Sequence, residues 1–336
     1  MNQTPRPDIV TVDHLTVVYP DGTRAVDNVS FRVGRGEIFG FLGPNGAGKS
    51  TTIKTLTTLL RKTSGRVSVA GEDIDKAPAE IRSAIGVLSQ ETVVDVDLTG
   101  RENLLLFGRL QHVPRATLED RVDSLLKVVE LEEAANKPAG RYSGGMRKRL
   151  DLASALVHEP SLLFLDEPTT GLDPQSRAAL WAYLEAINRE KGVTIFLTTQ
   201  YMEEADRLCQ RIAIIDHGHL IGGGTPRELK AALGGETIEL SFEPPADGEL
   251  VGRAARVLER IEGLSHVSRS SAGLSANAPD AGRIISSVVT TLAKEEIHPS
   301  ALSVSTPTLD DVFLRLTGRR IRSEELDRKT TEPFLS

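Results

Sequence analysis

The residues best suited to bind phosphate lie in the segment GPNGAGKST. The segment fits G-x-x-x-x-G-K-[ST], follows the apolar run EIFGFL and precedes the helix-like run TTIKTLTTLL. Glycines let backbone amides approach phosphate oxygens, and a helix N-terminus attracts anions. Lys49 is expected to reach the β and γ phosphates, and Ser50 to bind Mg²⁺. The predicted nucleoside triphosphate loop consists of Gly43, Pro44, Asn45, Gly46, Ala47, Gly48, Lys49, Ser50 and Thr51.

A pair of acids ends a second apolar run, in LLFLDEPTTGLDP. Asp166 matches the carboxylate that helps to hold Mg²⁺ at the end of a strand in phosphate-loop ATPases. Glu167 follows it, and side chains alternate along a strand, so Glu167 is expected to face an attacking water as general base. The alternative is that both acids merely cap a strand before the proline turn.

A polar residue, Gln200, ends the apolar run VTIFLTT. The strand delivers it to the sheet edge where a γ phosphate is expected. A glutamine there offers a hydrogen-bond donor and an acceptor but does not titrate near neutral pH. Gln200 is therefore interpreted as a γ-phosphate contact with a catalytic role, with a plain turn amide as the alternative.

A second phosphate-binding pattern begins at Tyr142, in YSGGMRKRLDLASAL. Ser143, Gly144 and Gly145 stand at the start of a predicted helix, where amides and a hydroxyl favour anions. One chain cannot easily wrap both phosphate sites around one nucleotide. Two chains arranged head to tail are therefore expected to share two ATP molecules. The basic run 147–149 is expected to be a solvated helix face, with a position near the nucleotide as the alternative.

The elements that position these residues indicate an α/β fold with a second, smaller domain. Residues 8–42 alternate like antiparallel strands, whereas AIGVLS, SLLFLD, VTIFLTT and RIAIID predict strands of a mostly parallel sheet. A helical insertion is expected at about 98–158, opening with Thr99 and Glu102 spaced as a capping box. These parts make a predicted domain at 8–232.

The segment 235–318 follows the order β-α-β-β-α-β, which predicts a ferredoxin-like α+β domain. Its hairpin is expected to turn at Ala272–Gly273, and residues 319–336 are predicted to be disordered.

Composition limits the possible functions. The 336 residues have a formal net charge of −7, so a basic nucleic-acid footprint is absent. The single cysteine fits a reducing cytosol. No apolar run approaches the roughly 20 residues of a membrane helix. Any action at a membrane therefore requires a partner that spans it.

The order and spacing of the phosphate loop, Ser-Gly-Gly, LLFLDE and GLD resemble the ATP-binding subunits of ABC transporters. The tail segment TPTLDDVFLRLTG extends the resemblance to the daunorubicin-resistance type of drug-export ATPase. The resemblance implies ATP and Mg²⁺ as cofactors, a homodimer, and an integral-membrane permease as partner. It further implies a peripheral location at the cytoplasmic face of the membrane and export of a drug, antibiotic or lipid-like substrate.

The resemblance also implies roles for single residues. Tyr19 is similar to the aromatic that stacks on adenine, and Asp173 to the aspartate that crosses the dimer interface. Gln90 resembles the glutamine that contacts Mg²⁺ or water, with Ser50 and Asp166 completing the metal site. Residues 91–110 are the expected docking surface for the permease.

Two departures from the family pattern stand out. Tyr142 and Met146 flank Ser-Gly-Gly where the family carries leucine and glutamine, and Gln200 replaces the usual histidine. An alternative function is a non-transport ABC ATPase acting on ribosomes or DNA, although those proteins usually carry two cassettes or a coiled coil. An importer ATPase is a third possibility.

Overall fold

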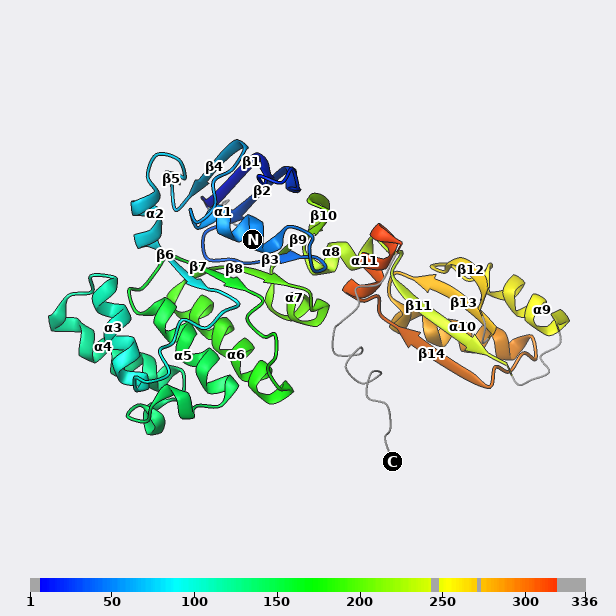
Figure 1. Ribbon diagram of the computed structural model, residues 1–336. Coiled ribbons are helices and arrows are strands. Elements are labelled where there is room, and N and C mark those ends of the chain that lie inside the picture. The colour runs from blue at the N-terminus through cyan, green and yellow to red at the C-terminus, as the bar shows by residue number, and fades with distance from the viewer. Residues whose placement is uncertain (1–6, 243–247, 271–272, 319–336) are drawn as a thin grey trace, which may run out of the picture. The chain divides into compact units, whose positions relative to one another are not determined.

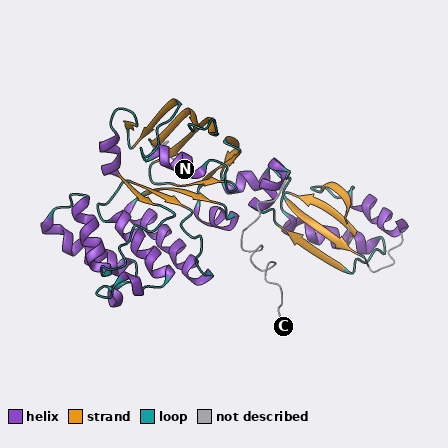
Figure 2. Cartoon of the chain, in the orientation of Figure 1, coloured by secondary structure: helices purple, strands orange, loops and turns teal. Residues whose placement is uncertain are grey.

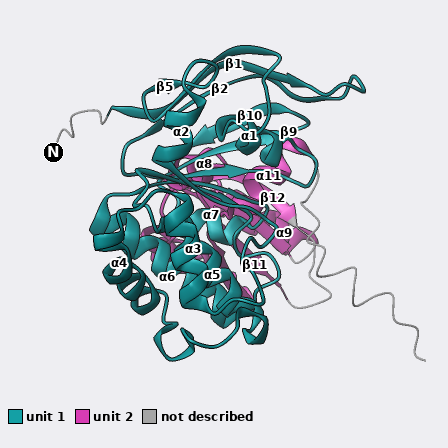
Figure 3. Ribbon diagram, turned by 60° about the vertical axis from the view of Figure 1, so that its left-hand side comes forward, with its two compact units in different colours: residues 1–225, 321–336 teal, residues 226–320 magenta. Residues whose placement is uncertain are grey.

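The computed structural model describes residues 7–242, 248–270 and 273–318. The described residues up to Thr225 form one compact unit, and those from Pro226 form a second (Figure 3). The predicted turn residue Ala272 and the predicted disordered tail 319–336 lie outside the described residues.

A six-stranded sheet forms the centre of the first unit. Its order is β10-β9-β3-β8-β7-β6, with β10 antiparallel to β9 and the other neighbours parallel. The four apolar runs predicted as parallel strands are β6, β7, β8 and β9, so that prediction is confirmed. The strands are β3 (Ile38–Leu42), β6 (Ile85–Leu88), β7 (Leu162–Asp166), β8 (Thr194–Thr199), β9 (Arg211–Asp216) and β10 (His219–Gly224).

An antiparallel sheet of order β2-β1-β4-β5 lies on one side of the central sheet (Figure 1). Helix α1 (Lys49–Leu56) packs between the two sheets. Phe39, Phe196 and Phe164 align across three parallel strands, and Phe196 lies 5.6 and 5.4 Å from the other two ring centroids. The strands are β1 (Asp8–Val18), β2 (Arg24–Gly34), β4 (Ser64–Val69) and β5 (Glu72–Asp73).

The remaining helices of this unit lie mainly on the other side of the central sheet (Figure 2). Thr99 caps α3 and forms the predicted capping box with Glu102. The helices are α2 (Pro78–Ala84), α3 (Gly100–Leu110), α4 (Arg115–Val128), α5 (Gly144–Leu156), α6 (Pro174–Lys191) and α7 (Met202–Leu208). Short 3-10 turns cover Glu132–Ala134 and Ala139–Arg141.

The second unit is a four-stranded antiparallel sheet of order β12-β13-β11-β14. Buried residues of α9 and α10 share one core with its central strands. This chain order and sheet order confirm the ferredoxin-like prediction. Helix α8 (Pro226–Ala231) packs against α11. The other elements are β11 (Glu236–Ser241), α9 (Gly248–Leu258), β12 (Ser265–Ser270), β13 (Gly273–Ala278), α10 (Ala281–Lys294), β14 (Ala301–Ser305) and α11 (Leu309–Thr317).

Candidate nucleotide site

A cavity of about 510 Å³ lies at the carboxyl ends of the parallel strands. This edge is the usual ligand site of open α/β sheets. The lining joins the phosphate loop to residues far away in the sequence. The lining residues are Tyr19, Thr23, Ala25, Asn45, Gly46, Gly48, Lys49, Ser50, Thr51, Gln90, Glu167, Thr170 and Gln200.

Two glycines of the loop are required by close backbone contacts. A Cβ at Gly43 would lie 2.3 Å from the carbonyl oxygen of Ile215, and one at Gly48 would lie 2.3 Å from that of Ala25. Gly48 also has a φ of 106°, which L side chains rarely adopt. The loop can therefore pack this tightly only with glycine at both positions.

The cavity contains a buried ion pair between the phosphate-loop lysine and the predicted base. Lys49 Nζ lies 3.0 Å from Glu167 Oε1, and the two side chains are 4% and 6% exposed. Lys49 also donates to the carbonyl oxygens of Gly43 and Pro44, at 2.8 and 3.1 Å. Gln90 Nε2 donates to Glu167 Oε2 at 3.1 Å. The structure therefore brings Lys49, Gln90 and Glu167 into one cluster.

The direction of Glu167 has a different cause from the one expected. Strand β7 ends at Asp166, so alternation along a strand does not set the Glu167 side chain. Glu167 has a left-handed backbone with φ of 49°, and its N–H donates to the carbonyl and hydroxyl oxygens of Thr198 at 3.1 and 3.2 Å. The reasoning from alternation was wrong, although Glu167 does line the cavity.

Asp166 is held from the neighbouring strand and does not itself line the cavity. It faces Thr198 in the β7–β8 register, and the Thr198 hydroxyl donates to Asp166 Oδ1 at 2.5 Å. The Asp166 carboxylate, the Ser50 hydroxyl and the Gln90 amide each carry an oxygen donor. Such hard donors fit Mg²⁺.

Gln200 is buried at the cavity wall, and its Oε1 has no hydrogen-bond partner among the described residues. A buried polar atom without a partner costs about 1–3 kcal/mol. A ligand in the cavity that donates to this oxygen, such as a positioned water, would remove that cost. Tyr19 lies at the same cavity and its hydroxyl is 3.0 Å from Thr51 Oγ1.

The Ser-Gly-Gly residues and Asp173 lie within the described part of the chain but do not line this cavity. Ser143 caps α5 by accepting from the Met146 N–H at 3.2 Å, and Asp173 caps α6 by accepting from the Ser176 N–H at 2.9 Å. Both are exposed. A Cβ at Gly145 would lie 2.6 Å from Ser176 Oγ, so the two helix N-termini adjoin. With Gly144 they make an exposed group of residues that is the candidate second half-site.

Helix α5 fixes the loop that carries Gln90. Lys148 Nζ donates to the carbonyl oxygen of Ser89 at 3.2 Å, and burial lowers the pKa of Lys148. Asp151 accepts from the Thr92 hydroxyl at 2.7 Å and from the next two backbone N–H groups at 3.1 and 3.2 Å. Burial raises the pKa of Asp151. The expectation that 147–149 is a solvated face was wrong, because Lys148 packs on this loop.

One buried acid lies just beyond Gln200 on α7. Glu204 is fully buried, and the Trp181 indole donates to its Oε1 at 3.0 Å. Burial raises the pKa of Glu204. Sequence reasoning missed Glu204, Asp151 and Thr198. A signal for Thr198 was present in the sequence, because the run of β8 ends in two threonines and the run of β7 ends in Asp166. Parallel strands that end together could have brought a threonine hydroxyl to that carboxylate.

Comparisons with known proteins agree with this geometry. The ABC transporter family matches residues 26–170, and the ATP-binding protein DrrA1-3-like C-terminal domain matches residues 224–317. The daunorubicin resistance ATP-binding protein DrrA3 of Streptomyces coeruleorubidus is 44% identical over 315 residues, covering 93% of this chain and 98% of that protein. Nod factor export ATP-binding protein I of Ralstonia nicotianae is 40% identical over 319 residues, covering 94% and 95%.

A solved structure shows the same fold. The dimeric structure of MJ0796, a bacterial ABC transporter cassette, aligns with a TM-score of 0.59 at 27% identity, over 64% of this chain and 98% of that one. The parallel sheet, the phosphate loop and the buried acids at the strand ends define an ABC-type ATPase.

The chain belongs to the family of ABC exporter ATP-binding subunits that includes the daunorubicin-resistance proteins. The resemblance inferred from the sequence is thereby confirmed, and the matches favour export over the ribosome, DNA and importer alternatives. Within the described residues, no helix is both long and apolar enough to cross a bilayer.

Proposed function

We propose that this ATPase binds Mg-ATP in the cavity at the strand ends and works as a homodimer that drives a separate membrane permease. The observation that carries the proposal is the buried cluster of Lys49, Glu167 and Gln90 inside the phosphate-loop cavity. An ion pair that served only to stabilise the fold would have no reason to line the same cavity as the phosphate loop.

The ion pair acts as an exchangeable contact. A γ phosphate brings negative charge to Lys49 and competes with Glu167 for its ammonium group. Released from Lys49, Glu167 remains in reach of Gln90 and accepts a proton from the attacking water. Gln200 donates to the γ phosphate through its amide nitrogen and orients the water with its unpaired Oε1.

Ser50, Gln90 and Asp166 are the residues that would hold Mg²⁺. The bound ion supplies charge neutralisation for the β and γ phosphates. The Thr198 hydroxyl keeps the Asp166 carboxylate oriented for this role. Tyr19, at the cavity near Thr51, stacks on the adenine ring.

The second half-site belongs to a second copy of the chain. Ser143, Gly144, Gly145 and Asp173 are assigned to the phosphates of the partner's ATP, because they do not line the chain's own cavity. The dimeric structure of the MJ0796 cassette supports this arrangement. ATP closes the dimer, and hydrolysis reopens it.

The permease docks on the loop and helix after Gln90. The segment 91–110 exposes Val93, Val96, Leu106 and Leu110, with Leu110 62% exposed. Four large exposed apolar side chains within one segment support its assignment as an interaction surface. Asp151 of α5 hydrogen-bonds to Thr92 and Val93 of this surface, and Ser143 caps the same helix. A movement of the permease would therefore be transmitted through α5 to the Ser143 half-site.

The cargo is an amphipathic drug, antibiotic or lipid-like molecule, and the ATPase lies at the cytoplasmic face of the membrane. The names of the relatives support this assignment. Nucleic acid is not an expected partner.

The test is an efflux assay with the chain and a polytopic membrane protein that co-purifies with it. Cells that express both are expected to retain less daunorubicin, a fluorescent amphipath, than cells that express either alone. Replacing Glu167 with Gln should abolish the difference. Equal retention with active and inactive ATPase would reject the assignment to drug export.

A further inference from the structure

A second cavity, of about 760 Å³, lies at the opposite end of the parallel sheet from the nucleotide residues. Ser161 lines it just before β7, and Val193 and Thr194 line it at the start of β8. The described lining residues of the two cavities do not overlap. Small-molecule sites are typically about 300–1,000 Å³, so this cavity has the size of a ligand site.

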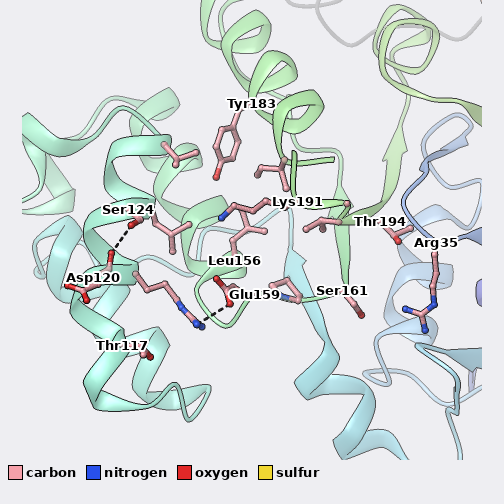
Figure 4. Close-up of a pocket in the computed structure, with 17 residues that line it drawn as sticks. Arg35, Thr117, Asp120, Ser124, Leu156, Glu159, Ser161, Tyr183, Lys191 and Thr194 are labelled. Atoms are coloured by element: carbon pink, nitrogen blue, oxygen red, sulfur yellow. Dashed lines mark hydrogen bonds and ion pairs between the residues drawn. The ribbon is translucent and has the colours of Figure 1, made fainter. Parts of the chain in front are cut away.

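Two helices supply facing walls of the cavity (Figure 4). On α6, Tyr183, Ile187 and Lys191 follow at four-residue intervals, so they form one stripe of the helix. On α4, the lining positions fall at intervals of three and four residues and also form one stripe. They are Thr117, Asp120, Arg121, Ser124, Leu125 and Val128. A molecule between these stripes would contact α4 and α6 together.

The floor of the cavity is apolar. Leu125, Leu156, Ile187 and Val193 line it from four different elements or their ends, and all four are otherwise buried. Val128 at the rim remains 44% exposed. An apolar body placed here would cover surface that now faces solvent, which is favourable at about 25 cal/mol per Å².

The cation of the α4 wall is already paired, and the other charged group of that wall is the exposed carboxylate of Asp120. Arg121 pairs with Glu159 at 3.0 Å and donates to the carbonyl oxygen of Val157 at 3.2 Å. The Ser124 hydroxyl donates to the carbonyl oxygen of Asp120 at 2.8 Å. The hydrogen-bond donors available to an anion therefore come from the α6 wall.

Two donors on α6 have no partner within the described residues. The Tyr183 hydroxyl makes no hydrogen bond there, and the Lys191 ammonium forms no ion pair there. Burial raises the pKa of Tyr183, so the phenol stays a neutral donor. Helical side chains lean toward the N-terminus, which directs the Lys191 stem back toward the turn of Tyr183. Figure 4 shows both side chains directed toward the cavity.

We propose that this cavity binds a small amphipathic anion, with an apolar ring body and one carboxylate or sulfonate group. The body rests on Leu125, Leu156 and Ile187, and the anionic group accepts hydrogen bonds from Tyr183 and Lys191. A mostly apolar pocket with a few convergent polar groups is the usual form of such a site. The site is separate from the nucleotide and from the proposed permease surface.

The test compares two probes that differ by one charge. Anilinonaphthalene sulfonate carries the anionic group, and phenylnaphthylamine is the same ring system without it. Trp181 is the single tryptophan of the chain and lies on α6, two residues before Tyr183. Energy transfer from Trp181 therefore reports a probe bound near α6, and the lining variants assign it to this cavity. The sulfonate is expected to bind more tightly than the uncharged amine, and saturating Mg-ATP is expected not to displace it.

Matched variants test which side chains contact the sulfonate group of the probe. Lys191→Met is expected to weaken sulfonate binding about tenfold and to leave the amine unchanged, because it removes a charge-assisted contact. Tyr183→Phe should weaken the sulfonate by a smaller factor. Lys127→Met, an exposed α4 lysine that does not line the cavity, is the control and should change neither probe. Val128→Phe should exclude both. Unchanged sulfonate affinity in Lys191→Met, or displacement by Mg-ATP, would overturn the proposal.

Discussion

The two halves of the nucleotide machinery differ in how complete they are within one chain. At the phosphate-loop half, Lys49, Gln90 and Glu167 contact one another in a buried cluster. At the other half, Ser143 and Asp173 are exposed and hydrogen-bond only within their own helix starts, as far as the described contacts show. The residues of the first half already contact one another as in a complete site. The residues of the second half are exposed, so they can meet a ligand that another chain holds.

We infer that the buried residues carry out the chemistry and that the exposed residues meet the partner chain's nucleotide. Removing a residue of the buried half should stop the chemistry and leave assembly intact. Removing a residue of the exposed half should leave the chain's own ATP affinity intact and stop the chemistry of the ATP that the partner chain holds.

The largest expected effect comes from Glu167→Gln. The amide keeps the size of the side chain but cannot accept the proton, so we expect the turnover rate to fall about a thousandfold. ATP affinity should be retained, and the dimer should accumulate on size exclusion with Mg-ATP. Glu190→Gln, on the exposed surface of α6, is the control. Normal turnover in Glu167→Gln would remove this residue from the role of base.

A substitution in the exposed half should reduce turnover without reducing ATP binding to the single chain. Ser143→Arg places a bulky cation at the α5 N-terminus, so turnover should fall about a hundredfold because this helix start can no longer contact the ATP held by the partner chain. ATP binding to the single chain should stay within about twofold of wild type, because Ser143 lies outside the chain's own cavity. Equilibrium binding of a fluorescent ATP analogue measures this. A parallel loss of binding would mean that Ser143 serves its own chain's nucleotide.

Gln200 tests the chemistry within the buried half. Gln200→Ala should lower turnover about ten- to a hundredfold with little loss of ATP affinity, because one oriented donor is lost. Gln200→His should stay active, since imidazole also presents a donor and an acceptor. Steady-state kinetics separate the two effects. If the alanine variant turns over normally, the amide is only a turn residue.

The smallest effect should be a pH dependence of stability at Glu204. Burial raises its folded pKa above the unfolded value, so the stability linked to its proton is present at acidic pH and is lost as pH rises through the folded pKa. Glu204→Gln removes this dependence and keeps an acceptor for Trp181. Urea unfolding at about pH 5 and about pH 8 should show wild type losing more stability than the variant. Parallel losses would contradict a raised pKa.

Local features were predictable from the sequence, and contacts between distant strands were not. The phosphate loop was predictable because nine consecutive residues carry their own geometry. Gln200 and Asp166 were placed at the sheet edge because parallel strands end there together. The bond from Thr198 to Asp166 depends on the register of β7 and β8, which no local pattern contains.

The errors have similar physical causes. Alternation cannot describe Glu167, because β7 ends one residue earlier and the backbone turns left-handed. Helical periodicity cannot show that Lys148 meets Ser89, because that loop is 59 residues away in sequence. In both cases, contacts with residues of other elements set the direction of the side chain.

The central claim is that each ATP lies between the buried half of one chain and the exposed half of another. The most direct test mixes Glu167→Gln with Ser143→Arg, two variants that should each be nearly inactive. A mixed dimer would contain one complete site, built from the intact Glu167 of one chain and the intact Ser143 of the other. Equal mixing should restore about a quarter of the wild-type ATPase rate. A mixture no more active than its two components would contradict the shared site.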